Sequence, residues 1–212
     1  MVEILRKKIR GEEFDYQTLI DCLKGYSNPR AKITQLLKKG IIIRIKKGLY
    51  IFGDAFRRKP YSKELLANLI YGPSYISLEY ALQYYGMIPE QVEALTSVTS
   101  GRSRKFFTPV GLFTYRQIPV YALSTGMDRI ELKDDRSFLI ATPEKALADK
   151  IISDRGVSFN TQKTLLDYME NDLRIDMEHL LSLNPAVLND IAERYSSGKL
   201  KKLINFIQKN NI

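Results

Sequence analysis

The sequence predicts an α+β protein, and three observations lead to this class. Segments with helical spacing of apolar residues alternate with runs of β-branched and aromatic residues over roughly the first 140 residues. Clusters of glycine, proline and serine separate these segments at short intervals. From Thr142 onward the spacing is helical. We therefore expect helices combined with a small, mainly antiparallel sheet, followed by a helical C-terminal tail.

The first 40 residues predict three short helices separated by glycine-containing turns. These helices cover residues 2–8, 14–24 and 27–39. Ser27 or Asn28 begins the third helix as its N-cap, with Pro29 in the first turn. Two helices joined by a short turn that contains glycine are typical of a helix-turn-helix.

A short hairpin follows the third helix directly. Residues 41–45 and 49–52 are rich in strand-forming side chains, and Lys46, Lys47 and Gly48 lie between them. Gly48 supplies the positive φ that such a turn needs. A helix-turn-helix followed by a hairpin predicts an N-terminal winged helix-turn-helix.

The third helix divides into an apolar face and a polar face. Helical spacing directs Ile33, Leu36 and Leu37 inward, and leaves polar and basic side chains outside. Arg and Lys can bind guanine or phosphate, and Asn and Gln can bind adenine. The predicted DNA-binding residues, including those of the hairpin, are Ser27, Asn28, Arg30, Lys32, Thr34, Gln35, Lys38, Lys39, Arg44, Lys46 and Lys47.

The excess of positive charge is confined to the N-terminal part of the chain. The whole sequence has a net charge of +9, and its first 60 residues contain 15 basic and six acidic residues. The rest contains 18 of each, so the N-terminal part holds the entire excess. This asymmetry favours a polyanionic partner for one domain only. A solvated basic helix face and a winged helix that binds protein are the alternatives.

We predict two domains, residues 1–58 and residues 59–212. Arg57, Arg58, Lys59 and Pro60 form the charged junction. In the second domain we expect helices at residues 62–71, 76–86 and 142–151, strands at 94–99, 105–108, 111–118 and 137–141, and tail helices at 161–170, 176–183, 185–196 and 199–209. Residues 100–103 are expected to form a hairpin turn between the first two strands.

The second domain shows little sign of catalytic chemistry. His179 has no cysteine or second histidine at ligand spacing, so neither a metal site nor a histidine-based triad is expected. Glu144 and Lys145 are interpreted as residues that begin a helix. We predict no catalytic residue, no metal and no cofactor.

One basic cluster in the second domain supports a binding hypothesis. It consists of Arg102, Arg104, Lys105 and Arg116, on or beside the predicted central hairpin. It could face an acidic protein or nucleic acid, and ordinary exposed hairpin charge is the alternative.

Several classes of protein are not expected. No apolar run approaches the roughly 20 residues that a membrane span requires. The first ten residues lack the apolar core of a signal peptide, and the single Cys22 excludes an internal disulfide. We expect a cytoplasmic protein with a buried, structural Cys22.

Five short motifs, taken together in their order and spacing, resemble a known family. They are KKGLY at residues 46–50, YISLEYAL at 75–82, GMIP at 86–89, TSVTSGRSR at 96–104 and ATPEKAL at 141–147. Over roughly residues 14–152 the chain resembles the AbiEi-type antitoxins, which are transcriptional regulators of type IV toxin–antitoxin and abortive-infection (phage defence) systems.

The resemblance implies a function for each domain. It implies a winged-helix domain that binds operator repeats in double-stranded DNA and represses the toxin–antitoxin operon. It also implies a second domain that neutralises a cognate nucleotidyltransferase toxin, and no catalytic residues. The alternative is a winged-helix regulator or adaptor whose second domain senses a ligand or a protein partner.

Overall fold

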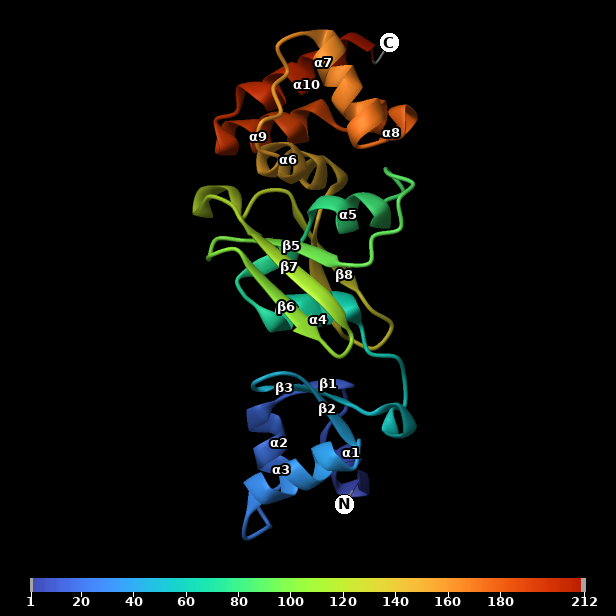
Figure 1. Cartoon of the computed structure of the whole chain (residues 1–212), viewed down its shortest axis with the longest axis vertical. Coiled ribbons are helices and arrows are strands. Elements are labelled where there is room, and N and C mark those ends of the chain that lie inside the picture. The colour runs from blue at the N-terminus through green and yellow to red at the C-terminus, as the bar shows by residue number, and fades with distance from the viewer. Residues whose placement is uncertain (1, 211–212) are drawn as a thin grey trace.

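The computed structural model describes residues 2–210 and has the α+β architecture expected from the sequence. Figure 1 shows an elongated molecule in which the two ends of the described chain lie far apart. Three helices and a small sheet form the N-terminal end, a larger sheet lies in the middle, and helices form the C-terminal end. Among the described residues, no helix is long and apolar enough to cross a membrane.

The N-terminal unit, residues 2–58, contains three short helices and a three-stranded antiparallel sheet. The helices are α1 (Val2–Lys8), α2 (Tyr16–Cys22) and α3 (Pro29–Lys38), and Asp54–Phe56 forms the 3-10 turn η1. The strands are β1 (Glu13–Asp15), β2 (Ile42–Lys46) and β3 (Leu49–Phe52), in the order β1-β3-β2. The three predicted helices and the hairpin are confirmed. The sequence pattern does not predict β1, because this three-residue strand pairs with distant β3.

Local side-chain contacts determine where α2 and α3 begin. Asp15 accepts a hydrogen bond from Thr18 N at 2.7 Å, and its contacts with Thr18 lower the pKa of the Asp15 carboxyl. Of the two N-caps predicted for α3, Asn28 has this role, since its Oδ1 accepts from Ala31 N at 3.0 Å. Gly48 has a φ of +91° between β2 and β3, as predicted.

The small sheet separates two hydrophobic cores. On one side, Leu19, Leu36 and Phe52 belong to the core of the N-terminal unit. On the other side, Ile45 and Leu49 belong to the larger core that continues into the second unit. The hairpin β2–β3 therefore packs against both parts of the molecule.

The second unit, residues 59–210, is built on a six-stranded mixed sheet. Its strands are β4 (Ser74–Ile76), β5 (Leu95–Thr99), β6 (Arg104–Thr108), β7 (Gly111–Gln117), β8 (Met127–Glu131) and β9 (Ser137–Ala141), in the order β6-β7-β5-β4-β9-β8.

The expected small, mainly antiparallel sheet is confirmed in part, since the pairs β4–β5, β6–β7 and β8–β9 are antiparallel. The pairs β5–β7 and β4–β9 are parallel. Residues 100–103 do not form a hairpin turn between paired strands, because β7 inserts between β5 and β6 in the sheet. The short strands β4 and β8 are not predicted from the sequence.

The helices of the second unit agree closely with the sequence pattern. They are α4 (Lys63–Ile70), α5 (Leu78–Tyr84), α6 (Pro143–Ser153), α7 (Gln162–Asp167), α8 (Met177–Ser182), α9 (Pro185–Tyr195) and α10 (Gly198–Asn210). A 3-10 turn, η2 (Val120–Ala122), follows β7, and a π-helical turn, η3 (Tyr168–Asp172), extends α7. Ser62 and Thr142 cap α4 and α6 as expected. The predicted helical tail is confirmed.

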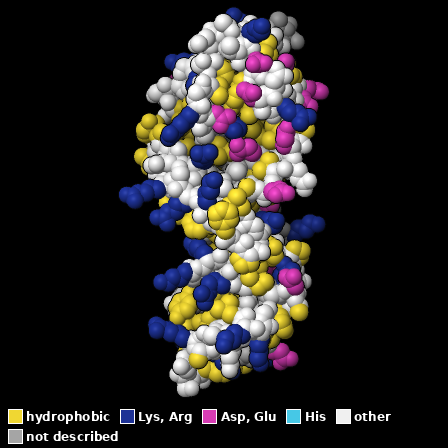
Figure 2. Space-filling view, in the orientation of Figure 1, with side chains coloured by type: hydrophobic (Ala, Val, Ile, Leu, Met, Phe, Trp, Pro, Cys, Tyr) yellow, Lys and Arg dark blue, Asp and Glu magenta, His cyan; other side chains and the backbone are white. Residues whose placement is uncertain are grey.

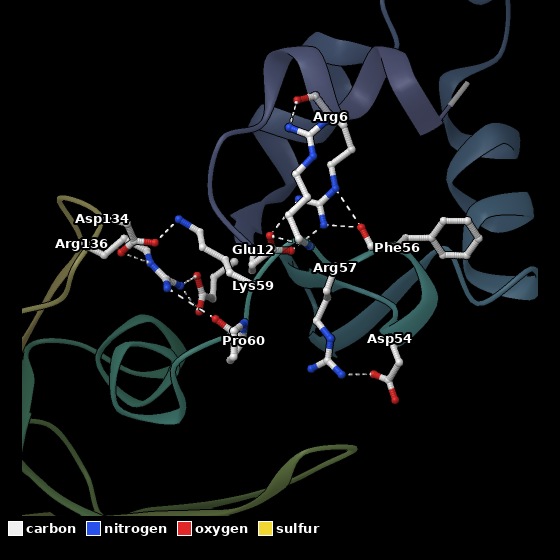
Figure 3. A network of polar contacts seen from close by, with 11 residues as sticks. Arg6, Glu12, Asp54, Phe56, Arg57, Lys59, Pro60, Asp134 and Arg136 are labelled. Atoms are coloured by element: carbon white, nitrogen blue, oxygen red, sulfur yellow. Dashed lines mark hydrogen bonds and ion pairs between the residues drawn. The ribbon is translucent and has the colours of Figure 1, made fainter.

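Charged side chains join the two units at the junction (Figure 3). Glu13 from β1 accepts from Arg136 Nη1 at 2.6 Å, and its side chain is 1% exposed. Asp134 binds both Arg136 and Lys59. Beside them, Arg6 forms a buried, bidentate pair with Glu12, at 3.0 and 2.6 Å. Each of these carboxylates therefore has a cation next to it.

Candidate nucleic-acid interface

Helix α3 presents one polar, solvent-exposed face. Its buried side chains are Ile33 and Leu36, as the sequence spacing predicts, and Leu37 is partly buried against the same core. The exposed predicted residues on and before this helix are Ser27, Asn28, Arg30, Thr34, Gln35, Lys38 and Lys39, and Lys32 is half-buried. The helix therefore offers amide, hydroxyl and cationic groups to an external partner.

The hairpin β2–β3 brings its cations next to this helix. Tyr16, Arg30, Arg44, Lys47 and Tyr50, together with Gly48, line an open hollow between α3 and the hairpin. Arg30 comes from α3, whereas Arg44 and Lys47 come from the hairpin, so two separate elements supply the positive charge. We call this feature the basic hollow. Three cations around one concave surface favour a phosphate group.

No acidic side chain neutralises these cations. Within residues 2–210, no carboxylate lies within 4.0 Å of any of Arg30, Lys32, Lys38, Lys39, Arg44 and Lys47. Five of the six acidic residues of the N-terminal unit are engaged elsewhere. Asp15 caps α2, and the remaining pairs are Glu12 with Arg6, Glu13 with Arg136, Asp21 with Lys24 and Asp54 with Arg57. Figure 2 shows the result on one face: Lys and Arg dominate the lower, N-terminal part, and most Asp and Glu lie in the upper part.

Tyrosine rings lie beside two of the cations. Lys32 Nζ lies 5.0 Å from the centroid of the Tyr26 ring, and Arg44 Cζ lies 5.9 Å from that of Tyr50. These rings restrict the long side chains without neutralising them. Thr34 Oγ1 donates to the Arg30 carbonyl at 3.2 Å, so this hydroxyl is partly occupied by its own helix.

Lys46 does not share this surface. It is half-buried, and its Nζ donates to the carbonyl of Ile70 at the end of α4. Burial lowers the pKa of the Lys46 ammonium. A bulge between Arg44 and Lys46 in β2 accompanies this orientation. Lys46 therefore belongs to the contact between the two units, and we remove it from the candidate DNA-binding set.

The predicted basic cluster of the second unit does not form one continuous surface. Arg102, Arg104, Lys105 and Arg116 are all exposed. Arg104 pairs in register with Tyr115, and its Cζ lies 5.3 Å from the Tyr71 ring. Lys105 pairs with Thr114 on the opposite face of the sheet, which is also the face of Arg116. Arg116 instead shares a hollow with Arg155, which the sequence pattern does not single out.

A cluster of polar side chains is buried between the larger sheet and helices α6 and α9. Lys145 Nζ lies 2.7 Å from Asp149 Oδ1, one helical turn away, and donates to Tyr195 OH at 2.9 Å. Asp149 also accepts from Tyr75 OH at 3.0 Å and Ser77 Oγ at 2.7 Å. We call these five residues the buried cluster.

The surroundings of the buried cluster indicate a structural role within the core. Burial lowers the pKa of Lys145, while the adjacent Asp149 opposes that effect. Burial and Asp149 together raise the pKa of Tyr75 and of Tyr195. Both ionic side chains are 0% exposed, so a substrate cannot reach them. The sequence interpretation of Lys145 as a helix-start residue misses this pair, although the i, i+4 spacing of Lys145 and Asp149 among small and apolar residues is a visible signal.

The residues considered for metal chemistry are not gathered in space. Among residues 2–210, no group of three or more His, Cys, Asp or Glu side chains could hold a metal ion. His179 is exposed and lies 3.7 Å from Asp176, its neighbour on the same helix. Cys22 is buried, and desolvation raises the pKa of its thiol, in line with a structural role.

Comparison with known proteins adds no relative to this picture. A scan against protein-family models gives no match for the chain. A search of curated proteins gives no match either. The proposals below therefore rest on the surfaces described above and on the five sequence motifs.

Proposed function

We propose that this protein is a DNA-binding antitoxin of the AbiEi type, located in the cytoplasm. In this proposal, the N-terminal unit is a winged helix-turn-helix that binds operator repeats and represses the toxin–antitoxin operon. The second unit counteracts a cognate nucleotidyltransferase toxin, and the chain has no catalytic activity of its own.

The order of elements in the N-terminal unit supports the winged-helix interpretation. Helices α2 and α3 follow each other across a short turn, and the hairpin β2–β3 comes directly after α3. Strand β1 adds to the free side of the hairpin, which gives the order β1-β3-β2. In such a unit α3 enters the major groove, and the hairpin lies against the neighbouring backbone.

The basic hollow is the observation that carries the DNA proposal. Arg30 on α3 and Arg44 and Lys47 on the hairpin converge there, with no carboxylate partner among the described residues. Backbone phosphates bound one to each of these three cations would fix the helix and the hairpin on the DNA. An α-helix with its side chains is about 10–12 Å across, so α3 fits the major groove of about 12 Å width, with its ten residues spanning about 15 Å. Gln35 on its exposed face is then the best candidate to read a base.

The DNA proposal is tested with duplexes from the region upstream of the gene, over a salt series. Wild type should bind a specific duplex more tightly than a scrambled one. Replacing Arg30, Arg44 and Lys47 with glutamine should weaken the salt dependence. The magnitude of the slope of log K against log salt should fall by about 0.9 for each lost phosphate contact. Lys201→Gln is a single-charge control, since it removes one charge from α10 at the opposite end of the molecule (Figure 1).

Two results would contradict the DNA proposal. One is equal affinity for the specific and scrambled duplexes, which would mean that the chain does not recognise an operator sequence. The other is an unchanged salt slope in the neutralised variant, which would mean that the residues of the basic hollow do not contact DNA phosphates.

The antitoxin role rests on the resemblance of the five motifs, which span both units. Its test is co-expression with the product of the adjacent gene. If that product is a nucleotidyltransferase-like toxin, growth should stop when it is expressed alone and recover when this chain is present. Growth arrest that persists with wild-type chain would reject the antitoxin role and leave the DNA proposal standing.

The second candidate function is a winged-helix regulator or adaptor whose second unit senses a ligand or a protein partner. The exposed cations Arg102, Lys105 and Arg116 favour it, because none of them has a carboxylate partner among residues 2–210. Unchanged DNA affinity after the three neutralising substitutions would favour this candidate over the antitoxin.

A further inference from the structure

A polar hollow in the second unit lies where three separate elements end. Ser103 comes from the connection before β6, Arg116 and Gln117 from the end of β7, and Ser153 and Arg155 from the end of α6 and the residues after it. We call it the arginine hollow. Its volume of about 410 Å³ can hold a phosphate group together with a sugar.

The sheet topology explains why these residues meet. Because β5 and β7 are parallel and adjacent, the ends of both strands lie at the same edge of the sheet, with Thr99 opposite Gln117. The chain that leaves β5 therefore passes the end of β7, and Ser103 Oγ accepts from Gln117 N at 2.9 Å. Arg116 is held on a strand of the rigid sheet rather than on a loop.

The charge around the arginine hollow has one sign. No acidic residue lines it, and within residues 2–210 no carboxylate lies within 4.0 Å of either arginine. The acid nearest in sequence, Asp154, is engaged elsewhere, since it binds Lys150 Nζ at 2.9 Å and Tyr168 OH at 2.7 Å. Two guanidinium groups are thus left to face a ligand. The Ser103 hydroxyl can also donate, because the bond from Gln117 uses its oxygen as acceptor.

We propose that the arginine hollow binds the phosphate group of a small phosphorylated molecule. Guanidinium groups bind phosphate oxygens through paired hydrogen bonds, and a phosphate monoester offers enough oxygens for both arginines and for a serine hydroxyl. Ile152 and the neighbouring Pro119 add an apolar wall against which the remainder of such a molecule packs. This proposal does not rest on the proposed operator binding, and occupancy of the arginine hollow can be measured without DNA.

Isothermal titration calorimetry on the full-length chain tests the site. The probes are inorganic phosphate, ribose 5-phosphate and adenosine monophosphate, with adenosine as the uncharged control. Wild type should bind the phosphorylated probes, and Arg116→Gln and Arg155→Gln should each weaken binding at least tenfold. Lys133→Gln, which removes an exposed charge from the connection between β8 and β9, should bind like wild type. Tighter binding of the two esters than of inorganic phosphate identifies a phosphorylated metabolite, and equal binding identifies free phosphate.

Three outcomes would overturn the proposal. The first is that wild type binds none of the phosphorylated probes while its circular dichroism spectrum shows a folded chain. The second is that Lys133→Gln weakens binding as much as the arginine variants do, which indicates non-specific attraction. The third is that the arginine variants lower the salt slope of DNA binding while no small probe binds, which assigns the hollow to nucleic acid.

Discussion

The basic hollow and the buried cluster use the same chemical groups in opposite ways. In the N-terminal unit, Arg30, Arg44 and Lys47 are exposed and have no carboxylate partner among the described residues. In the second unit, Lys145 is fully buried, and Asp149 lies 2.7 Å from it. The first arrangement leaves positive charge available to an outside partner, whereas the second uses it within the fold.

This difference explains why the distribution of charge along the sequence indicates which part of the chain has cations without acidic partners. Residues 61–212 contain equal numbers of basic and acidic residues, and several charges of the second unit pair internally, as Lys145 does with Asp149 and Lys150 with Glu79. The N-terminal unit has an excess of cations, so some of them must remain without a partner. Helix α3 and the hairpin present those cations on one surface.

The largest expected effect comes from breaking the buried cluster. Lys145→Met removes the cation and leaves the Asp149 carboxylate buried without a counter-charge. We expect the free energy of unfolding to fall by about 3–5 kcal/mol. Urea denaturation followed by circular dichroism measures this loss.

A double variant separates the charge effect from simple loss of packing. In Lys145→Met combined with Asp149→Leu, no charge remains buried at this site, so the loss should be smaller than in the single variant. A single variant that loses less than about 1 kcal/mol would contradict the assignment of a buried ion pair. A double variant less stable than the single one would contradict it as well.

Much of the fold can be predicted from the sequence because its signals are local. The N-caps Asn28, Ser62 and Thr142 lie directly before the helices that they begin. Strands β1 and β4 escape prediction because they pair with strands distant in the chain, as in the pairing of β1 with β3. Strand β8 pairs with the adjacent strand β9, and it escapes because its sequence MDRIE is largely polar and exposed. The parallel pairing of β5 with β7 escapes for another reason: β5 and β6 are joined by a short connection, and such a connection suggests a hairpin.

The candidate site is predictable where a local sequence pattern determines exposure. Ile33 and Leu36 on α3 are assigned correctly to the buried side, which places the polar residues outside. Arg155 is not predicted, because its proximity to Arg116 depends on where α6 ends relative to β7. The burial of Lys145 depends on Tyr195, 50 residues further along the chain.

The junction between the two units should respond less strongly than the buried cluster. Glu13→Gln weakens the contacts of Glu13 with Arg136 and with Ser62 N, but Arg136 keeps its contact with Asp134. We expect a loss of about 1.5–3 kcal/mol in the free energy of unfolding, since a buried charged acceptor is removed. Urea denaturation measures it, and Glu131→Gln serves as control. Glu131 is 60% exposed in its pair with Arg129, so its loss should stay within about 1 kcal/mol. Equal losses in both variants would mean that burial adds nothing to the junction pair.

Lys46 and Lys47 are neighbours in the sequence with different surroundings, and they should differ by a small change in DNA binding. Lys47 lines the basic hollow, whereas Lys46 donates to the Ile70 carbonyl at the junction. If the proposed DNA interface is correct, Lys47→Gln should lower the salt slope of binding by about 0.9, the value for one phosphate contact. Lys46→Gln should leave the slope unchanged, because the native ammonium does not face the hollow. Fluorescence anisotropy with a labelled duplex measures both slopes, and urea denaturation verifies that both variants are folded. Equal reductions in slope would place Lys46 at the DNA after all, and its contact with Ile70 would then have to open when DNA binds.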